Sequence, residues 1–333
     1  MNSSNERKSL SVLSLFDGIS CGRVALDRCN IPVKDYFAYE IEPNAIKISR
    51  YNYPEIHQCG DVFAEDFSKY QGIDLLIGGS PCTNFSGAKC TKTAKAKKET
   101  KPNEGEGWDL FKQYVRALHE SQPKYFLYEN NYRISQEIQD AISDALGVKP
   151  VLIDSQLVSA QRRKRLYWTN IPVSGLPKDK GILVQDVICG ASSLIKEFDD
   201  RMRNTLIKCE NYIKYDLGGK GHYSQQDRLY YLDNKAPTVP RCRTETKFNV
   251  WLGGELYKKT CPLEIERLQT LPDDYTKYGR EADGTIVEMP KTRRFEAIGN
   301  GWTVDIIAWI LRGIKNEAEH DKPDYGIAKG ILK

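Results

Sequence analysis

Two short runs carry side chains that can attack or protonate a ring. Cys82 ends the run GGSPC (78–82), and a cysteine with thiolate character is a nucleophile. Glu129 stands before Asn130, and a carboxylic acid beside a nucleophile can protonate or hydrogen-bond a ring nitrogen. Taken alone, Cys82 reads also as a buried structural cysteine, so the chemistry depends on what lies around it.

A third run, QRRKR (161–165), is strongly basic. Alternate residues of an extended segment point the same way, so Gln161, Arg163 and Arg165 could all face one site. A second basic segment holds six lysines between Lys89 and Lys101, opposed there by Glu99 alone. Such a run is typical of a solvated loop, and phosphate binding is the alternative.

The N-terminal part could hold a cofactor that contains a nucleoside. The turn DGISCG (17–22) follows a short apolar segment ending at Phe16, and backbone N–H groups of such a turn face a ligand. It is not a GxGxxG turn, which weakens a dinucleotide interpretation. Glu40 ends a second strand-like segment and could bind ribose hydroxyls, while Asp61 follows a third. Each reads also as an ordinary turn or cap residue, but their spacing together favours such a cofactor.

Strand-like and helix-like segments alternate through the first half of the chain. We predict strands at 11–16, 36–40, 73–77 and 125–128, and helices at 23–29, 43–51, 108–120 and 135–146. This alternation predicts an α/β fold with a mostly parallel sheet covered on both faces. The rhythm breaks after about residue 168, so we expect a second, smaller domain around 175–254. A helix is predicted again at 303–314.

Composition limits the class of protein. The 333 residues are 40% hydrophobic and 28% charged, which excludes a wholly disordered, collagenous or fibrous chain. No apolar run reaches the ~18 residues of a membrane span, and residues 1–8 lack the apolar core of a secretion signal. Nine cysteines without a CxxC pair indicate a reducing, cytoplasmic setting. The net charge of +4 alone says nothing about nucleic acid.

The ordered runs FDG, YE, GDV, GGSPC, EN, QRRKR, ERLQTLPDDY and AIGN resemble the DNA (cytosine-5) methyltransferases. The resemblance covers nearly the whole chain except its middle part and its tails. FDGISCG (16–22) is similar to the de novo mammalian type, whereas 259–276 is similar to bacterial and phage members. Thr83 and Asn131 depart from the residues common in the family, which puts local loop packing in doubt rather than the reaction type.

This resemblance implies S-adenosylmethionine as methyl donor, S-adenosylhomocysteine as product, and no metal. It also implies a Rossmann-like methyltransferase sheet with a smaller target-recognition domain. We expect a catalytic domain at 1–183, target recognition at 184–290, and a return to the catalytic domain at 291–333. The residues expected at the cofactor are Phe16, Asp17, Gly18, Ile19, Ser20, Cys21, Glu40, Ile41, Asp61, Val62, Pro81, Asn300, Gly301 and Trp302.

The reaction implied by the resemblance is covalent catalysis at C5 of cytosine. Cys82 would add to C6, and Glu129 would contact N3 and the exocyclic amine. Arg163 would lie near O2, and Arg165 would orient Glu129 or line the site. The reacting base cannot be reached inside a stacked duplex, so it must be flipped out.

The expected partner is double-stranded DNA bound by a monomer, with no membrane. The lysine-rich segment 89–101 would contact phosphates. Five residues of the middle part are candidate DNA contacts, namely Arg228, Lys235, Thr238, Arg241 and Arg243. Whether a restriction endonuclease accompanies the enzyme stays open. The alternatives are a tRNA cytosine-5 methyltransferase and a catalytically inactive DNA-binding relative; a dinucleotide oxidoreductase would leave Pro81-Cys82 unexplained.

Overall fold

The structure, a computed structural model, describes residues 9–81, 104–190, 194–215, 225, 228–241 and 246–316. The chain forms two compact units: the first contains 1–153, 164–176 and 307–333, and the second 154–163 and 177–306. These limits differ from the predicted boundaries after residues 183 and 290. The Gln269 side chain donates to the carbonyls of Ile298 (3.1 Å) and Gly301 (3.0 Å), which joins the segment after 290 to the second unit.

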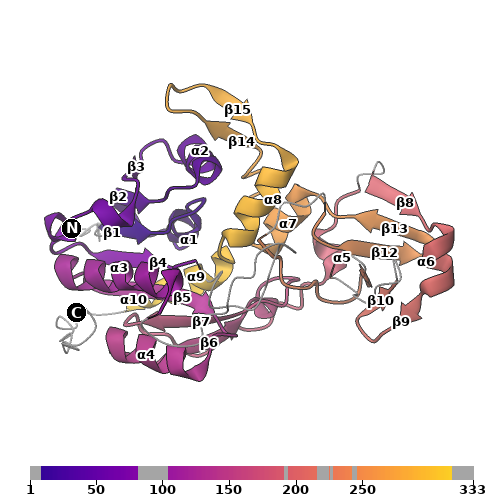
Figure 1. The fold of residues 1–333 in the computed structure, drawn as a ribbon, viewed down its shortest axis with the longest axis horizontal. Helices are drawn as coiled ribbons and strands as arrows, with labels where there is room; N and C mark the ends of the chain where they lie inside the picture. The colour runs from indigo at the N-terminus through magenta and orange to yellow at the C-terminus, as the bar shows by residue number, and fades with distance from the viewer. Residues whose placement is uncertain are drawn as a thin grey trace, which may run out of the picture. The chain divides into compact units, whose positions relative to one another are not determined.

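A seven-stranded sheet of order β3-β2-β1-β4-β5-β7-β6 forms the centre of the first unit (Figure 1). β1 pairs in parallel with both β2 and β4, so a topological switch point lies between β1 and β4, where open α/β sheets bind ligands. β5 is parallel to β4, and β7 is antiparallel to β5. The strands are β1 (Leu10–Leu15), β2 (Val33–Tyr39), β3 (His57–Gln58), β4 (Leu75–Gly78), β5 (Tyr125–Asn131), β6 (Val151–Asp154) and β7 (Lys164–Thr169).

Helices cover this sheet, which confirms the predicted α/β class. The predicted apolar face of α3 is confirmed, because Trp108, Phe111, Val115 and Leu118 are at most 2% exposed and pack in one core with α4. Side chains of the opposite sheet face are buried as well, as expected of a parallel sheet covered twice. The predicted helix at 303–314 breaks at Arg312. The helices are α1 (Cys21–Arg28), α2 (Pro43–Asn52), α3 (Glu106–Ser121), α4 (Gln136–Leu146), α9 (Val304–Leu311) and α10 (Gly313–Asn316).

The second unit holds a six-stranded sheet of order β8-β13-β12-β11-β10-β9 (Figure 1). Its small core includes Phe198, Met202, Ile213 and Leu229. The strands are β8 (Ile195–Glu197), β9 (Ile207–Lys208), β10 (Tyr212–Lys214), β11 (Arg228–Tyr230), β12 (Asn249–Gly253) and β13 (Leu256–Lys259), and β14 (Tyr278–Arg280) and β15 (Ile286–Glu288) form a separate hairpin. The helices are α5 (Val184–Val187), α6 (Asp200–Thr205), α7 (Pro262–Leu268) and α8 (Lys291–Asn300).

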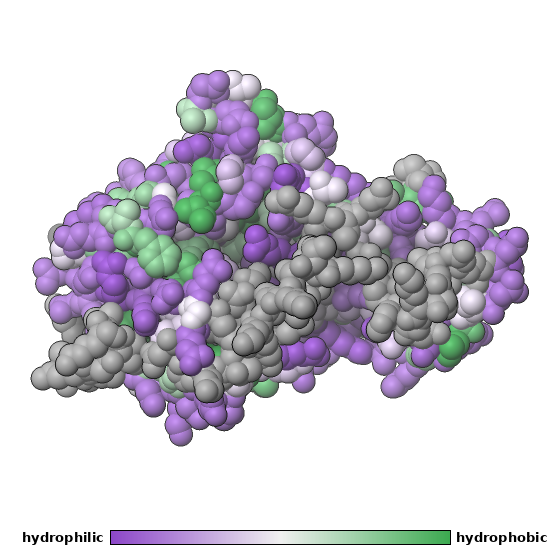
Figure 2. All heavy atoms as spheres, viewed as in Figure 1, coloured by the Kyte–Doolittle hydropathy of each residue, from purple (hydrophilic) through white to green (hydrophobic). Residues whose placement is uncertain are grey.

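The face of the molecule in Figure 2 is mostly hydrophilic, with apolar side chains in small groups. Among the described residues, none of the helices combines the length and the hydropathy that a membrane crossing needs.

Candidate active site

The turn after β1 has an unusual backbone. Phe16, Gly18 and Ser20 adopt positive φ angles of 57°, 59° and 61°. This region is unfavourable for phenylalanine and serine, and such conformations concentrate at ligand sites. The amide of Gly18 donates to Glu40 Oε2 at 2.8 Å, and Glu40 Oε1 accepts from the amides of the two residues that follow it, both at 2.8 Å. Glu40 therefore ties the turn after β1 to the end of β2.

Asp17 braces the same turn from inside. Its Oδ1 accepts hydrogen bonds from Ser14 Oγ (2.6 Å) and Tyr36 OH (2.7 Å), and its Oδ2 accepts one from Ser20 Oγ (2.5 Å). Burial raises the pKa of Asp17 to about 6, and the charge of Glu40 acts in the same direction, although the three hydroxyl groups oppose both. Ser20 Oγ lies 2.7 Å from Ser49 Oγ, which extends the network to α2. The carboxyl group is thus a structural part of the turn.

Apolar side chains flank the acids at the ends of these strands. Ile41 is 69% exposed and Phe63 is 51% exposed, both unusually open for large apolar groups. Asp61 is exposed and accepts a hydrogen bond from the amide of Phe63 (3.0 Å) at the start of η1 (Val62–Ala64), whereas Val62 is buried. Open apolar groups beside carboxylates suit a ligand with a flat base and ribose hydroxyls, so these residues fit S-adenosylmethionine.

Ile19 and Cys21, two of the predicted cofactor residues, have side chains that point into the core and can offer only their backbone. The side chains of Ile19 and Cys21 are at most 3% exposed and pack inside the first unit. Their amides lie at and beside the N-terminus of α1, which is a favourable place for a negatively charged group.

The carboxyl ends of β4 and β5 lie next to each other, with Gly78 paired to Tyr128. An added Cβ at Gly78 would lie 2.9 Å from the carbonyl oxygen of Leu15 and 3.0 Å from Tyr114 Cδ2. Only glycine therefore allows β1, β4 and α3 to pack this closely. This register brings the end of β4, which leads to Ser80 and Pro81, beside the strand end that carries Glu129.

A buried hydroxyl joins these two strand ends. Tyr128 OH lies 2.6 Å from Ser80 Oγ and accepts a hydrogen bond from Asn130 Nδ2 at 3.0 Å. Ser80 is 4% exposed and Asn130 is 1% exposed. Cys82 itself lies outside the described residues, and Pro81 is the last described residue before it. No pattern in the sequence singled out Tyr128, which reads as one more apolar position of a strand.

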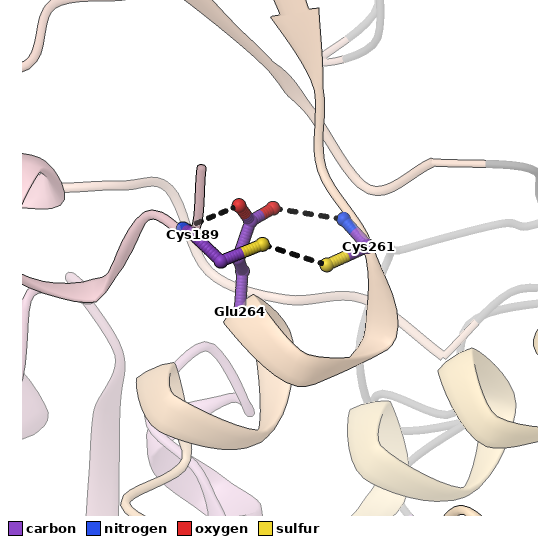
Figure 3. Close-up of side chains that lie close together, drawn as sticks. All are labelled: Cys189, Cys261 and Glu264. Atoms are coloured by element: carbon purple, nitrogen blue, oxygen red, sulfur yellow. Dashed lines mark hydrogen bonds between the residues drawn. The ribbon is translucent and has the colours of Figure 1, made fainter. Parts of the chain in front are cut away.

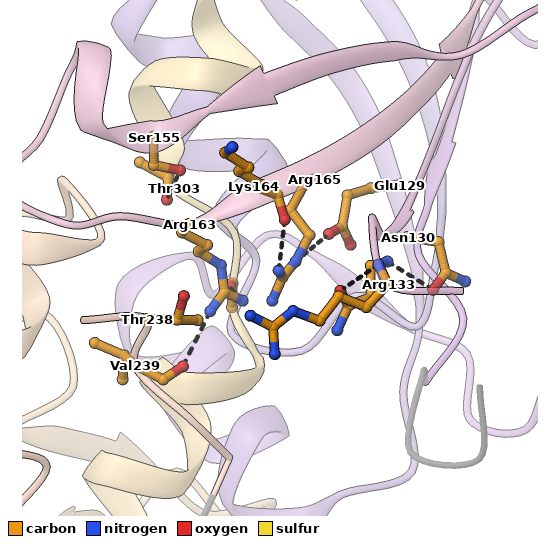
Figure 4. A network of polar contacts seen from close by, with 12 residues as sticks. Glu129, Asn130, Arg133, Ser155, Arg163, Lys164, Arg165, Thr238, Val239 and Thr303 are labelled. Carbon is orange, nitrogen blue, oxygen red and sulfur yellow. Dashed lines mark hydrogen bonds and ion pairs between the residues drawn. The ribbon is translucent and has the colours of Figure 1, made fainter. Parts of the chain in front are cut away.

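Glu129 forms an ion pair with Arg165 from the neighbouring strand β7 (Figure 4). Arg165 Nε lies 2.8 Å from Glu129 Oε1, and the two side chains are 12% and 13% exposed. The antiparallel register pairs Asn131 with Arg165, which sets the arginine beside the strand end that carries the acid. An ion pair with so little exposure fixes the orientation of the carboxylate.

Gln161 and Arg163 belong to the second unit. Arg163 donates to the carbonyls of Val239 and Gly301, both at 3.0 Å, and is 5% exposed (Figure 4). Gln161 is fully buried, accepts from the amide of Val239 (2.8 Å) and donates to Leu268 O (3.1 Å). Both side chains therefore join separate segments of this unit, and a contact of Arg163 with the base stays a prediction.

Further predicted residues of the second unit have varied surroundings. Asn300 is exposed, Gly301 is buried, and Trp302 is partly exposed. Lys235 Nζ donates to the carbonyls of Gln156 (2.8 Å) and Ser159 (3.1 Å), and burial lowers its pKa.

The other candidate DNA contacts are mixed. Thr238 Oγ1 donates to Arg162 O (2.6 Å), and the guanidinium of Arg228 lies 4.6 Å from the ring centre of Tyr212. The side chain of Arg241 is 43% exposed and lies 3.9 Å from Glu296. Arg243 and the lysine-rich segment lie outside the described residues.

The chain is similar in sequence to a known protein family and to several of its members. Residues 10–316 match the family model of C-5 cytosine-specific DNA methylases. The orphan methyltransferase M.Rho11sI of Bacillus phage rho11s is 28% identical over 216 residues, which cover 61% of this chain and 40% of that protein. The chain thus spans about two fifths of that relative. The type II methyltransferase M.Bsp6I of Bacillus sp. (strain RFL6) is 23% identical over 92% of this chain and 98% of its own length.

The fold is also that of a solved methyltransferase. The S. pombe Dnmt2 methyltransferase superimposes with a TM-score of 0.62 at 16% identity, covering 92% of this chain and 99% of that one.

Proposed function

Because the chain belongs to the C-5 cytosine-specific DNA methylase family, we propose that it transfers a methyl group to C5 of cytosine in double-stranded DNA. One observation carries this proposal. The Glu129–Arg165 ion pair and the buried Ser80–Tyr128–Asn130 contacts lie at the adjacent ends of β4 and β5, and Ser80 stands two residues before Cys82 in the chain. A nucleophile and a positioned acid at the carboxyl edge of a parallel sheet are what this reaction needs.

We propose that S-adenosylmethionine is the cofactor; when bound, it supplies the methyl group from its sulfonium centre. Around it, the amides of the turn after β1 would face the methionine part and Glu40 would accept from the ribose hydroxyls. Ile41 would pack against adenine, and Asp61 with Val62 would frame the adenine edge. The exposure of Ile41, at 69%, supports this assignment because a flat base would cover it.

The protein's own residues would then act on a flipped-out cytosine. The thiolate of Cys82 adds to C6, and the electron pair of the C5–C6 double bond makes C5 nucleophilic. Glu129 hydrogen-bonds to the ring at N3 and to the exocyclic amine, which stabilises the charge that develops. Arg165 holds Glu129 in place. C5 bonds to the methyl group, which leaves S-adenosylhomocysteine as the product. The C5 proton passes to solvent, and its electron pair restores the C5–C6 double bond as the Cys82–C6 bond breaks and the thiolate is released.

We propose that the second unit chooses the DNA sequence. The lysine-rich segment 89–101 would bind phosphates without choosing a sequence, since such contacts carry no base information. We also propose that the chain acts as a monomer in the cytoplasm of a bacterial or phage-infected cell; a companion restriction endonuclease would share its target.

Labelled S-adenosylmethionine tests the proposed function directly. The purified chain is incubated with the labelled cofactor and either unmethylated duplex DNA or tRNA, with Cys82→Ala as the inactive control. We expect label in duplex DNA with the wild type alone, and bisulfite sequencing then identifies the methylated cytosine. Label in tRNA but not in DNA would identify tRNA as the substrate, and no label in either would contradict the proposal.

A further inference from the structure

Two cysteines that are far apart in the chain meet in the second unit (Figure 3). Cys189 precedes β8 and Cys261 lies two residues after the end of β13, so the whole six-stranded sheet lies between them in sequence. Their sulfur atoms are 3.7 Å apart. Both residues are partly exposed and both are free thiols. The pair therefore stands where the chain enters the sheet and where it leaves it.

A single buried carboxylate fixes the backbone of both cysteines. Glu264, in the first turn of α7, accepts from the amide of Cys189 at Oε1 and from the amide of Cys261 at Oε2, each at 2.9 Å. Lys258 Nζ forms an ion pair with Oε1, and both side chains of that pair are at most 3% exposed. Because these hydrogen bonds fix the main chain at both cysteines, the two thiol groups lie opposite each other.

A metal ion does not suit this cluster. Both oxygens of Glu264 already accept hydrogen bonds or an ion pair, which leaves two sulfur atoms where a structural zinc site takes four ligands.

We propose that Cys189 and Cys261 form a reversible disulfide that covalently closes the base of the six-stranded sheet. A disulfide has a sulfur–sulfur bond of about 2.05 Å, so the sulfurs must approach from 3.7 Å by less than 2 Å, a movement within reach of side-chain rotation. Oxidised glutathione is a sufficient oxidant. The two thiols lose two protons and two electrons, and the glutathione disulfide takes them up to give two molecules of glutathione.

The expected effect is on stability and goes beyond the proposed function. The cross-link closes a loop of roughly 70 residues, which lowers the conformational entropy of the unfolded chain. We therefore expect the ratio of folded to unfolded protein to rise by about a thousandfold. In a reducing compartment the thiols persist, and the two segments are then joined by the hydrogen bonds of Glu264 without a covalent bond.

The test uses the full chain equilibrated with either oxidised glutathione or dithiothreitol. Peptide mapping without reduction looks for the Cys189–Cys261 linked peptide, and thermal unfolding compares the two states. Cys189→Ser and Cys261→Ser remove the pair, while Cys209→Ser, a partly exposed cysteine of the same unit, is the matched control. Bound zinc is measured in the untreated protein.

We expect the linked peptide and a higher midpoint temperature in oxidised wild type and oxidised Cys209→Ser. Neither should occur in the two pair variants, and dithiothreitol should reverse both. Absence of the linked peptide in wild type at full oxidation overturns the proposal without reference to any variant. So does one equivalent of zinc that disappears in both pair variants, or a linked peptide that leaves the midpoint unchanged.

Discussion

Replacing Tyr128 by phenylalanine removes one buried oxygen and should impair methyl transfer more than it impairs folding. That hydroxyl joins Ser80, two residues before Cys82, to Asn130, the neighbour of Glu129. The phenyl ring keeps its contacts with Phe111 and Trp168, with centroids at 5.2 and 5.8 Å, so the core volume hardly changes. The substitution therefore removes mainly the hydrogen bonds that join the ends of β4 and β5.

The magnitude follows from these two hydrogen bonds. A buried polar group that loses its partner costs about 1–3 kcal/mol, and two such groups are affected, so we expect the free energy of unfolding to fall by roughly 2–6 kcal/mol. The rate should fall on the order of tenfold to a hundredfold, because small displacements of a nucleophile have effects of this size. Denaturant unfolding and single-turnover methylation of a duplex under saturating cofactor measure the two quantities.

Tyr70→Phe is the matched control. Tyr70 lies on η2 (Phe67–Tyr70), and its hydroxyl lies 2.9 Å from Tyr39 OH, so this variant also deletes one oxygen from a paired hydroxyl in the same unit. It should lose stability and keep the single-turnover rate. If Tyr128→Phe methylates at the wild-type rate while folded, the Tyr128 hydroxyl does not position Cys82 and our reasoning is refuted.

Three further substitutions test separate parts of the account. Arg165→Lys removes the Nε–H that meets Glu129 at 2.8 Å, and should lower the single-turnover rate about tenfold while DNA affinity in a gel-shift assay is kept. The pKa of Asp17 is raised to about 6, so the free energy of unfolding of the wild type should fall by up to about 3 kcal/mol as pH rises from about 4 to 6. Unfolding measured over this pH range compares the wild type with Asp17→Asn, and the same pH profile in both proteins would contradict this. Gly78→Ala places a Cβ 2.9 Å from Leu15 O and should lower stability by about 1–3 kcal/mol in denaturant unfolding; an unchanged midpoint would show that β1 and β4 can separate freely.

The first unit was largely predictable because its elements are long and carry local signals. The apolar spacing of α3 and Gly147 at the end of α4 predicted both helices within a few residues of their observed ends. The position of β7 between β5 and β6 was not predictable, because strand order depends on pairing between distant segments. The second sheet was missed since its strands are two to five residues long, as in β9 and β12, and show no clear alternation.

The candidate site divides in the same way. From the family resemblance, Arg165 was expected to orient Glu129 or to line the site, and the two side chains form an ion pair. Tyr128 and Ser80 were missed, because a hydroxyl inside an apolar run shows its role only when its partner from another strand is known. The contact between Cys189 and Cys261 could not be predicted either, since a whole sheet separates the two residues in the chain.

Covalent trapping tests whether Cys82 attacks C6 of the target cytosine. A duplex with 5-fluorocytosine at the target retains fluorine where the C5 proton would leave, so the Cys82–C6 bond cannot break after methyl transfer. With S-adenosylmethionine present, we predict a denaturation-resistant complex whose cross-linked peptide contains Cys82. Cys82→Ala should form none yet bind DNA, and Glu129→Gln should form it about 10²–10⁴-fold more slowly. A cross-link at another cysteine, such as Cys21 or Cys59, or no cross-link on a methylatable target, would contradict the account.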